Sequence, residues 1–273
     1  MVEYFFEDSW WVSGLRSSGW MFFAAGLFIG VFRALRPIGA RISSTDIRVQ
    51  IQIGNIFWKR FRGAIIIGSN ATFDTSIEHG EISERSVQGQ FTSHHFGSAV
   101  SELDLKIRTA LAGTKPQRRH SDATKPFGKK LEFQLGTVAK VKADKRTGYL
   151  VAISRLNANK VAESDLNEYQ DALSMMWEEI RRRGTQEDIV CPVLGTGLSR
   201  LPLSRMEAIR VIVRSFVAAA SQGKLAGALT IVVHPRDLKN LDVKELREFL
   251  NCECTHRPSG PINSNAGPVG TAA

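Results

Sequence analysis

Three loops that follow apolar, strand-like segments carry the residue types that could bind a ligand. The most distinctive loop runs from Gly195 to Ser199 and leads into a helix-like segment that begins at Pro202. A small, glycine-rich turn of this kind exposes consecutive backbone N–H groups, and the N-terminus of the following helix adds a partial positive charge. The loop therefore predicts an anion site, although glycine turns between a strand and a helix are also common without a ligand.

Polar side chains gather in the other two loops as well. The first loop, Gly54–Phe57, contains Asn55. The second loop runs from Gly68 to Phe91 and carries the polar residues Asn70, Asp74, Ser86 and Gln88. Both loops follow apolar segments, so we expect their polar groups to lie at strand ends.

The segments that must position these loops alternate between strand and helix patterns. The strand patterns cover Asp46–Ile53, Ala64–Asn70, Gln134–Val141, Tyr149–Ser154, Asp188–Leu194 and Ala228–Val233. The helix patterns cover Gly97–Ala112, Asp165–Arg183, Pro202–Ser221 and Asp237–Leu250. This alternation predicts a mainly parallel sheet with helices on both faces. Such sheets bind ligands beyond the carboxyl ends of their strands.

The bulk composition fits one α/β domain with appendages. The chain has 273 residues, of which 43% are hydrophobic, and this is enough for a core without disulfide bonds. The three cysteines are odd in number and have no partners at zinc-type spacing, so we expect reduced thiols and neither a metal nor a cofactor.

The formal net charge of +9 is concentrated in the stretch Gly113–Lys130, which we call the basic loop, and in the residues up to Arg146. A basic excess suits phosphate-bearing ligands, an anionic membrane or nucleic acid, and it also suits a plain solvated loop. No basic strand with interleaved aromatic residues and no nucleic-acid motif is present, so we expect no nucleic-acid partner.

An uncharged segment near the N-terminus predicts a transmembrane helix. Residues Ser17–Phe32 carry no charge, and the apolar run continues to Leu35 if the Arg33 side chain reaches the membrane interface. A buried core helix and an interfacial helix are the alternatives. The acidic start of the chain argues against a signal peptide.

The flanking charges predict the orientation of this helix. Basic residues gather after it, within Arg33–Arg41, whereas only Arg16 precedes it, so the C-terminal side is expected in the cytoplasm of a cell with a single-pass inner-membrane anchor. Gly26 and Gly30 are spaced so that two such helices can approach closely, which weakly indicates a homo-oligomer.

Five divisions of the chain follow from these patterns. We expect an interfacial segment at 1–16, the transmembrane helix at 17–35, a linker at 36–45, the α/β domain at 46–251 and a disordered tail at 252–273. The tail is rich in Pro, Gly, Ser and Asn and lacks a core pattern.

Together, the three loops resemble the macro-domain family over roughly Asp46–Leu250. The resemblance rests on Gly-Asn-Ile after the first strand, Gly-Ser-Asn at the end of an apolar strand, and Pro-Val-Leu-Gly-Thr-Gly before a helix. It implies a three-layer α/β/α fold with a mixed, mainly parallel sheet and an ADP-ribose-type ligand. It also implies adenine near Asn55 and Ile56, the distal ribose near Asn70, and the diphosphate at the glycine loop.

The same resemblance implies a ligand site with residues from four parts of the chain. Those beyond Asn55, Ile56 and Asn70 are Phe73, Asp74, Ser86, Gln88, Gly89, Gly195, Thr196, Gly197, Leu198, Ser199, Arg200 and His234. Among these, Asp74 either orients the distal ribose or caps a local turn, and His234 either stacks near adenine or caps the end of a strand.

The second loop departs from the common family pattern, because Ser86-Val87-Gln88-Gly89-Gln90 stands where many members have a run of glycines. This version is similar to the transmembrane macro subfamily found beside TIR proteins in bacterial Thoeris-type anti-phage defence. That similarity implies a non-catalytic effector, which binds an ADP-ribose derivative such as histidine-ADP-ribose from a TIR enzyme and assembles at the membrane. The alternative is an ADP-ribosyl hydrolase that positions water with Asn70 and Asp74.

Overall fold

A computed structural model provides the structure of the chain. It describes residues 21–28, 30, 37–43, 45–78, 80–144, 146–156, 162–163, 165–195 and 203–255. The chain divides into two units, Met1–Pro37 and Ile38–Ala273.

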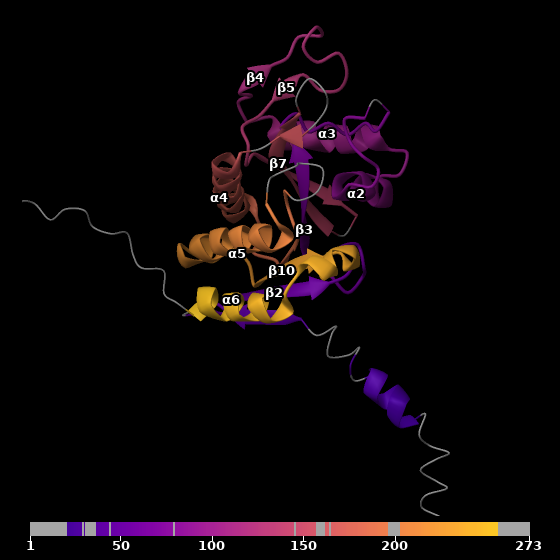
Figure 1. The fold of residues 1–273 in the computed structure, drawn as a ribbon. Coiled ribbons are helices and arrows are strands. Elements are labelled where there is room, and N and C mark those ends of the chain that lie inside the picture. Colours follow the sequence, from indigo (N-terminus) through magenta and orange to yellow (C-terminus); the bar gives the residue numbers. More distant parts are fainter. Residues whose placement is uncertain are drawn as a thin grey trace, which may run out of the picture. The chain divides into compact units, whose positions relative to one another are not determined.

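The second unit is built on one large mixed sheet (Figure 1). Its strand order is β1-β2-β10-β9-β3-β7-β6, and β8 pairs with β7 outside this path. The strands are β1 (Ile38–Arg41), β2 (Arg48–Ile53), β3 (Ala64–Asn70), β6 (Val138–Ala143), β7 (Arg146–Leu156), β8 (Ala162–Glu163), β9 (Ile189–Pro192) and β10 (Ala228–Val233). The five central strands are parallel, whereas β1 and β6 pair antiparallel at the two edges. The expected mixed, mainly parallel sheet is confirmed.

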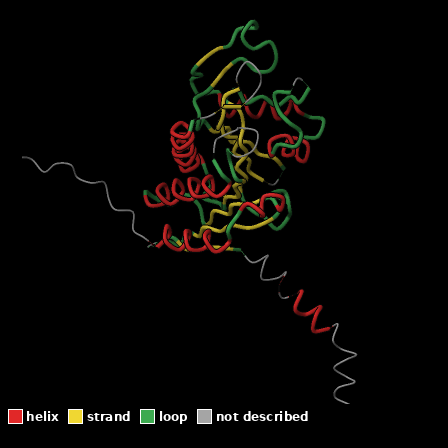
Figure 2. Tube along the Cα trace, viewed as in Figure 1, coloured by secondary structure: helices red, strands yellow, loops and turns green. Residues whose placement is uncertain are grey.

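Helices cover both faces of the sheet (Figure 2). They are α2 (Val87–His95), α3 (Val100–Leu111), α4 (Leu166–Arg183), α5 (Arg205–Ser221) and α6 (Val243–Thr255). One core joins α4, α5 and α6 to the sheet, and a second core joins α2 and α3 to its other face. Along β3, Ile66 belongs to the first core, whereas Ile65 and Ile67 belong to the second. A strand buried on both faces explains the unbroken apolar run in the sequence.

The connection from β2 to β3 runs through turns instead of an α-helix. Ile56 and Phe61 of this connection are buried in the second core, together with Val190 of β9 and Val232 of β10. The apolar side chains of this loop therefore pack on β9 and β10, on the face of the sheet that α2 and α3 also cover.

Helix caps explain where the expected helices begin. Asp165 caps α4, and its side chain accepts a hydrogen bond from the backbone N–H of Asn167. Ser204 and Glu207 form a capping box at the start of α5. The expected start at Pro202 is therefore wrong, because the capping box begins the helix at Arg205.

The helix expected over Asp237–Leu250 is confirmed only from Val243, because a cap at Asp242 separates that helix from a preceding 3-10 helix. His234 caps a 3-10 helix, η2 (Pro235–Asn240), and α6 follows separately. The Asp242 carboxylate accepts hydrogen bonds from the backbone N–H groups of Lys244 and Glu245, at 2.8 and 3.1 Å, and so starts α6.

Other boundaries differ from the sequence prediction at single elements. Residues expected as a loop at 87–91 form the start of α2, and β6 begins at Val138 instead of Gln134. β1 lies inside the stretch assigned to the linker, where it pairs with β2, and α6 extends to Thr255 in the stretch assigned to the tail. A short hairpin of β4 (Arg118–Arg119) and β5 (Leu131–Glu132) brackets much of the basic loop.

In the first unit, residues 21–28 are helical. Its large apolar side chains are mostly exposed, and Phe23 is 77% exposed. The predicted transmembrane helix at 17–35 lies only partly within the described residues. Among the residues that the structure describes, no helix has both the length and the apolar character to cross a membrane.

Candidate functional site

The predicted loops meet at one edge of the sheet. β2, β10, β9 and β3 are neighbours and run parallel, so their carboxyl ends lie side by side. Across these strands the edge presents, in order, Asn55, His234, Gly195 and Asn70. Residues that are far apart in sequence thus form one row at the edge where such sheets bind ligands.

A hydrogen bond from α4 holds the backbone at the start of the glycine loop. The buried Tyr169 hydroxyl donates a hydrogen bond to the Leu194 carbonyl at 3.1 Å. Burial, and to a lesser extent Cys191, raises the pKa of Tyr169 well above its usual value, so the hydroxyl keeps its proton. Gly195 has a φ of +79°, in the left-handed region that favours glycine. The predicted contacts Thr196, Gly197, Leu198, Ser199 and Arg200 lie outside the described residues.

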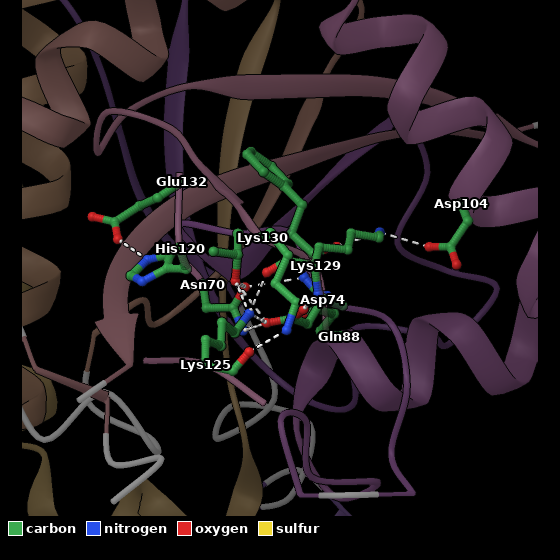
Figure 3. Close-up of polar contacts among 11 residues, drawn as sticks. Asn70, Asp74, Gln88, Asp104, His120, Lys125, Lys129, Lys130 and Glu132 are labelled. Atoms are coloured by element: carbon green, nitrogen blue, oxygen red, sulfur yellow. Dashed lines mark hydrogen bonds and ion pairs between the residues drawn. The ribbon is translucent and has the colours of Figure 1, made fainter. Parts of the chain in front are cut away.

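At the end of β3, Asn70 and Asp74 lie together (Figure 3), and with Thr72 they form a buried polar cluster. The Asn70 amide donates to Asp74 Oδ2 at 3.0 Å, and its carbonyl oxygen accepts from the Asp74 backbone N–H at 3.1 Å. The Thr72 hydroxyl donates to Asp74 Oδ2 at 2.6 Å. This double bridge to Asp74 fixes the direction of the Asn70 carboxamide.

The basic loop contributes the cation of this cluster. Lys125 Nζ donates to Asp74 Oδ2 at 2.6 Å, to Thr72 Oγ1 at 2.7 Å and to the Lys129 carbonyl at 2.7 Å. The backbone N–H of Lys129 donates to Asp74 Oδ1 at 2.6 Å. Only 14% of the Lys125 side chain is exposed. The interpretation of this stretch as a solvated loop is therefore wrong for Lys125 and Lys129, which are anchored to the strand end, whereas residues 126–128 between them are exposed.

A second ion pair fastens the same segment to α3. Lys129 Nζ lies 2.6 Å from Asp104 Oδ1 and also donates to the Phe73 carbonyl. Burial lowers the pKa of Lys129, although the neighbouring Asp104 opposes this effect. The segment is thus attached at two points, one on β3 and one on α3.

The hairpin that carries the basic loop is joined to the sheet through Glu132. This carboxylate is 2.5 Å from His120 Nε2, and its other oxygen accepts from Arg155 Nε at 3.2 Å. Arg155 lies in β7 and also pairs with Glu168 of α4. This bridge and the role of Lys125 were not predicted, because neither has a local sequence signal.

Three residues predicted to contact the ligand in the second loop also organise α2. The Ser86 hydroxyl caps the helix by accepting from the backbone N–H of Gly89 at 3.0 Å. The Gln88 amide donates to the Asp74 carbonyl at 2.6 Å and so ties α2 to the polar cluster. A Cβ at Gly89 would lie 2.4 Å from the Ser83 carbonyl oxygen, so the close approach requires glycine.

The remaining predicted residues are partly engaged within the protein. The Asn55 side-chain oxygen accepts from the Phe57 backbone N–H at 2.9 Å, and Ile56 is buried in the second core. His234 Nδ1 accepts from the Arg236 backbone N–H at 3.3 Å, which matches the predicted strand-end cap. Phe73 is fully buried and packs edge-on against Phe133, so it belongs to the core.

The described part of the chain holds no group of three or more His, Cys, Asp or Glu side chains that could bind a metal ion. A hollow of about 370 Å³ lies at the opposite edge, where Asp46 and Gly227 precede β2 and β10. It contains none of the predicted site residues. The row at the carboxyl ends therefore has the stronger chemical case.

Comparisons with known proteins agree with this fold. The model of the family "Thoeris protein ThsA, Macro domain" matches residues 49–234. The Thoeris protein ThsA of Bacillus amyloliquefaciens (strain Y2) is 26% identical over 206 residues, which cover 74% of this chain and 67% of that protein.

Solved macrodomains share the fold. The Oceanobacillus iheyensis macrodomain with MES bound superposes with a TM-score of 0.54 at 13% identity, covering 80% of this chain and 100% of that one. The same macrodomain with ADP gives a TM-score of 0.51 at 12% identity and covers 80% and 95% of the two chains. At these identities the similarity concerns the fold. The family match spans more than half of the sequence, and the chain therefore belongs to the Thoeris ThsA macro-domain family.

Proposed function

We propose that the domain binds an ADP-ribose-type nucleotide along the carboxyl edge of β2, β10, β9 and β3. The observation that carries this proposal is the order of the row Asn55, His234, Gly195 and Asn70 across adjacent strands. An extended nucleotide laid on this edge would place adenine at β2 and β10, the diphosphate at β9 and the distal ribose at β3. Membership of the ThsA macro-domain family supports the same ligand class.

Binding without turnover fits the polar cluster better than hydrolysis does. Asp74 accepts hydrogen bonds from Asn70, Thr72, Lys125 and the Lys129 backbone, and its side chain is 1% exposed. Both oxygens of this carboxylate already accept from protein donors, so a water molecule could reach it only by displacing one of them. The proposed role is therefore that of a sensor.

The sensor would act as a membrane effector in Thoeris-type defence. In this proposal, a partner TIR enzyme supplies an ADP-ribose derivative such as histidine-ADP-ribose, and binding drives self-assembly at the inner membrane, with the macro domain in the cytoplasm. The exposed apolar side chains of residues 21–28 support a lipid contact. A Cβ built at Gly26 or Gly30 would meet no described heavy atom within 4 Å, which leaves room for a second helix.

Calorimetric titration of the full-length chain in detergent tests the ligand assignment. The titrants are ADP-ribose and histidine-ADP-ribose, and we expect saturable binding of both with a preference for the derivative. Absence of binding to either would refute the assignment. Incubation with an ADP-ribosylated protein tests the alternative, since release of ADP-ribose would identify a hydrolase.

A further inference from the structure

We propose that Asp74 is a positioning residue that, with Lys125 as its counter-ion, orients Asn70 toward the distal ribose and holds the basic loop beside it. The proposal rests on the proposed function, because it assigns a role within the same ligand site. It replaces direct contact between Asp74 and the ligand with an indirect role.

Saturation of Asp74 is the first step of the argument. One carboxylate oxygen accepts from Asn70, Thr72 and Lys125, and the other accepts from the Lys129 backbone N–H. A ligand hydroxyl would have to displace one of these buried donors to reach the carboxylate, and the displaced group would lose its partner. Asp74 therefore acts through its neighbours.

Orientation of Asn70 is the second step. A carboxamide has an acceptor end and a donor end that a simple flip exchanges. Here Asp74 binds both ends, since its backbone N–H donates to Asn70 Oδ1 and its carboxylate accepts from Asn70 Nδ2. The second amide hydrogen of Asn70 has a fixed direction as a result, and this hydrogen can donate to a ribose hydroxyl.

The placement of the basic loop is the third step. Lys125 donates its three N–H groups to Asp74, Thr72 and the Lys129 carbonyl, so none is left to donate to a ligand. Gly128 has a φ of +76°, and a Cβ there would lie 2.4 Å from Asp74 Oδ1, which shows how closely the backbone passes the carboxylate. The segment 125–129 is consequently held against Asp74, the residue that orients Asn70.

The test compares ADP with ADP-ribose as titrants of the full-length protein, because only ADP-ribose reaches Asn70. The variants are Asp74→Asn and Lys125→Met, and Lys115→Met is the control, since Lys115 is an exposed lysine of the same loop. We expect each variant to lose about tenfold or more in affinity for ADP-ribose, the loss of roughly one well-made polar contact, with little change for ADP. The control should bind both ligands like the wild type.

A second readout covers the possibility that Asp74→Asn unfolds the domain. Lys125→Met leaves three of the four donors to Asp74 in place, and it should still speed hydrogen exchange at the Lys129 amide. Equal losses for ADP and ADP-ribose, or no loss for either, would overturn the positioning role while the wild type still binds. Failure of the wild type to bind either nucleotide would instead refute the proposed function and this role with it.

Discussion

Gly195 follows β9 in the glycine loop, where the proposed ligand would place its diphosphate. We expect Gly195→Glu to abolish ADP-ribose binding, because the side chain would place a negative charge where the diphosphate is expected and would strain a backbone with a φ of +79°. Titration calorimetry measures the loss. Gly97→Glu is the matched control, since Gly97 also has a positive φ, of +52°, but lies between α2 and α3. Similar binding losses in both variants would contradict a local effect at Gly195.

The three cysteines should differ sharply in reactivity. Burial raises the pKa of Cys191 far above its usual value and that of Cys254 to about 11, whereas Cys252 is exposed. A thiol whose pKa is raised stays protonated at neutral pH and reacts slowly. We therefore expect iodoacetamide at pH 8 to label Cys252 first, as followed by peptide mass spectrometry. Early labelling of Cys191 would show that its strand opens readily.

At the residue scale, the sequence singled out polar groups at the strand ends but not their partners within the protein. Asn70 and Asp74 stood out because they follow an apolar strand. Their partner Lys125 did not, because it is 51 residues from Asp74 and lies among many other lysines. Contacts across such distances depend on the path of the loop, which no local pattern records. Phe73 was placed in the site for its neighbours, yet its ring is buried.

At the level of elements, α5 offers a direct test of helix capping. Ser204→Ala removes the side-chain acceptor for the Glu207 backbone N–H, and we expect it to lower the free energy of unfolding by about 1 kcal/mol. Chemical denaturation measures this change. Ser174→Ala on the exposed face of α4 is the control and should be close to neutral, because that hydroxyl bonds only to the Gln170 carbonyl of the preceding turn. A larger effect at Ser174 would argue against the cap.

The basic loop allows a second test at this scale. Gly128→Ala should detach the loop from Asp74. The added Cβ would clash with the carboxylate, and the φ of +76° at this position is unfavourable for alanine. We expect faster tryptic cleavage after Arg118 and Arg119. Gly113→Ala is the control, because a Cβ there would meet nothing within 4 Å. Unchanged cleavage in Gly128→Ala would mean that the loop is held elsewhere.

Elements with a strong periodic pattern were predicted well, whereas the starts of α5 and α6, which depend on caps, were not. β3 and β10 match their predicted bounds, because continuous apolar runs end in clear polar turns. The division of the last helix depends on the side chain of Asp242, and the extension to Thr255 continues beyond the predicted end of the apolar stripe. β1 is only four residues long and gains its stability from pairing with β2, which its own sequence does not reveal.

For the whole molecule, we expect the N-terminal unit to provide membrane attachment and the macro domain to bind the ligand independently of it. Deletion of residues 1–36 should release the protein from the membrane fraction and leave ADP-ribose affinity unchanged, because β1 begins at Ile38. Ultracentrifugation of lysates and calorimetry measure the two effects. Retention of the truncated chain in the membrane pellet would contradict the proposed anchor, and would direct attention to the basic surface of the domain.

The strand order has a consequence for folding during synthesis on the ribosome. Among the strands that the structure describes, β10 comes last in the sequence, yet it is inserted between β2 and β9 in the middle of the sheet. Until that strand emerges, the early strand β2 has no parallel neighbour, and the loops that follow β2 and β9 are not brought together. A nascent chain, or one cut short before residue 228, would thus be unable to respond to a signal, even if its N-terminus had already entered a membrane. Under the proposed function, ligand binding would begin only after β10 has been made.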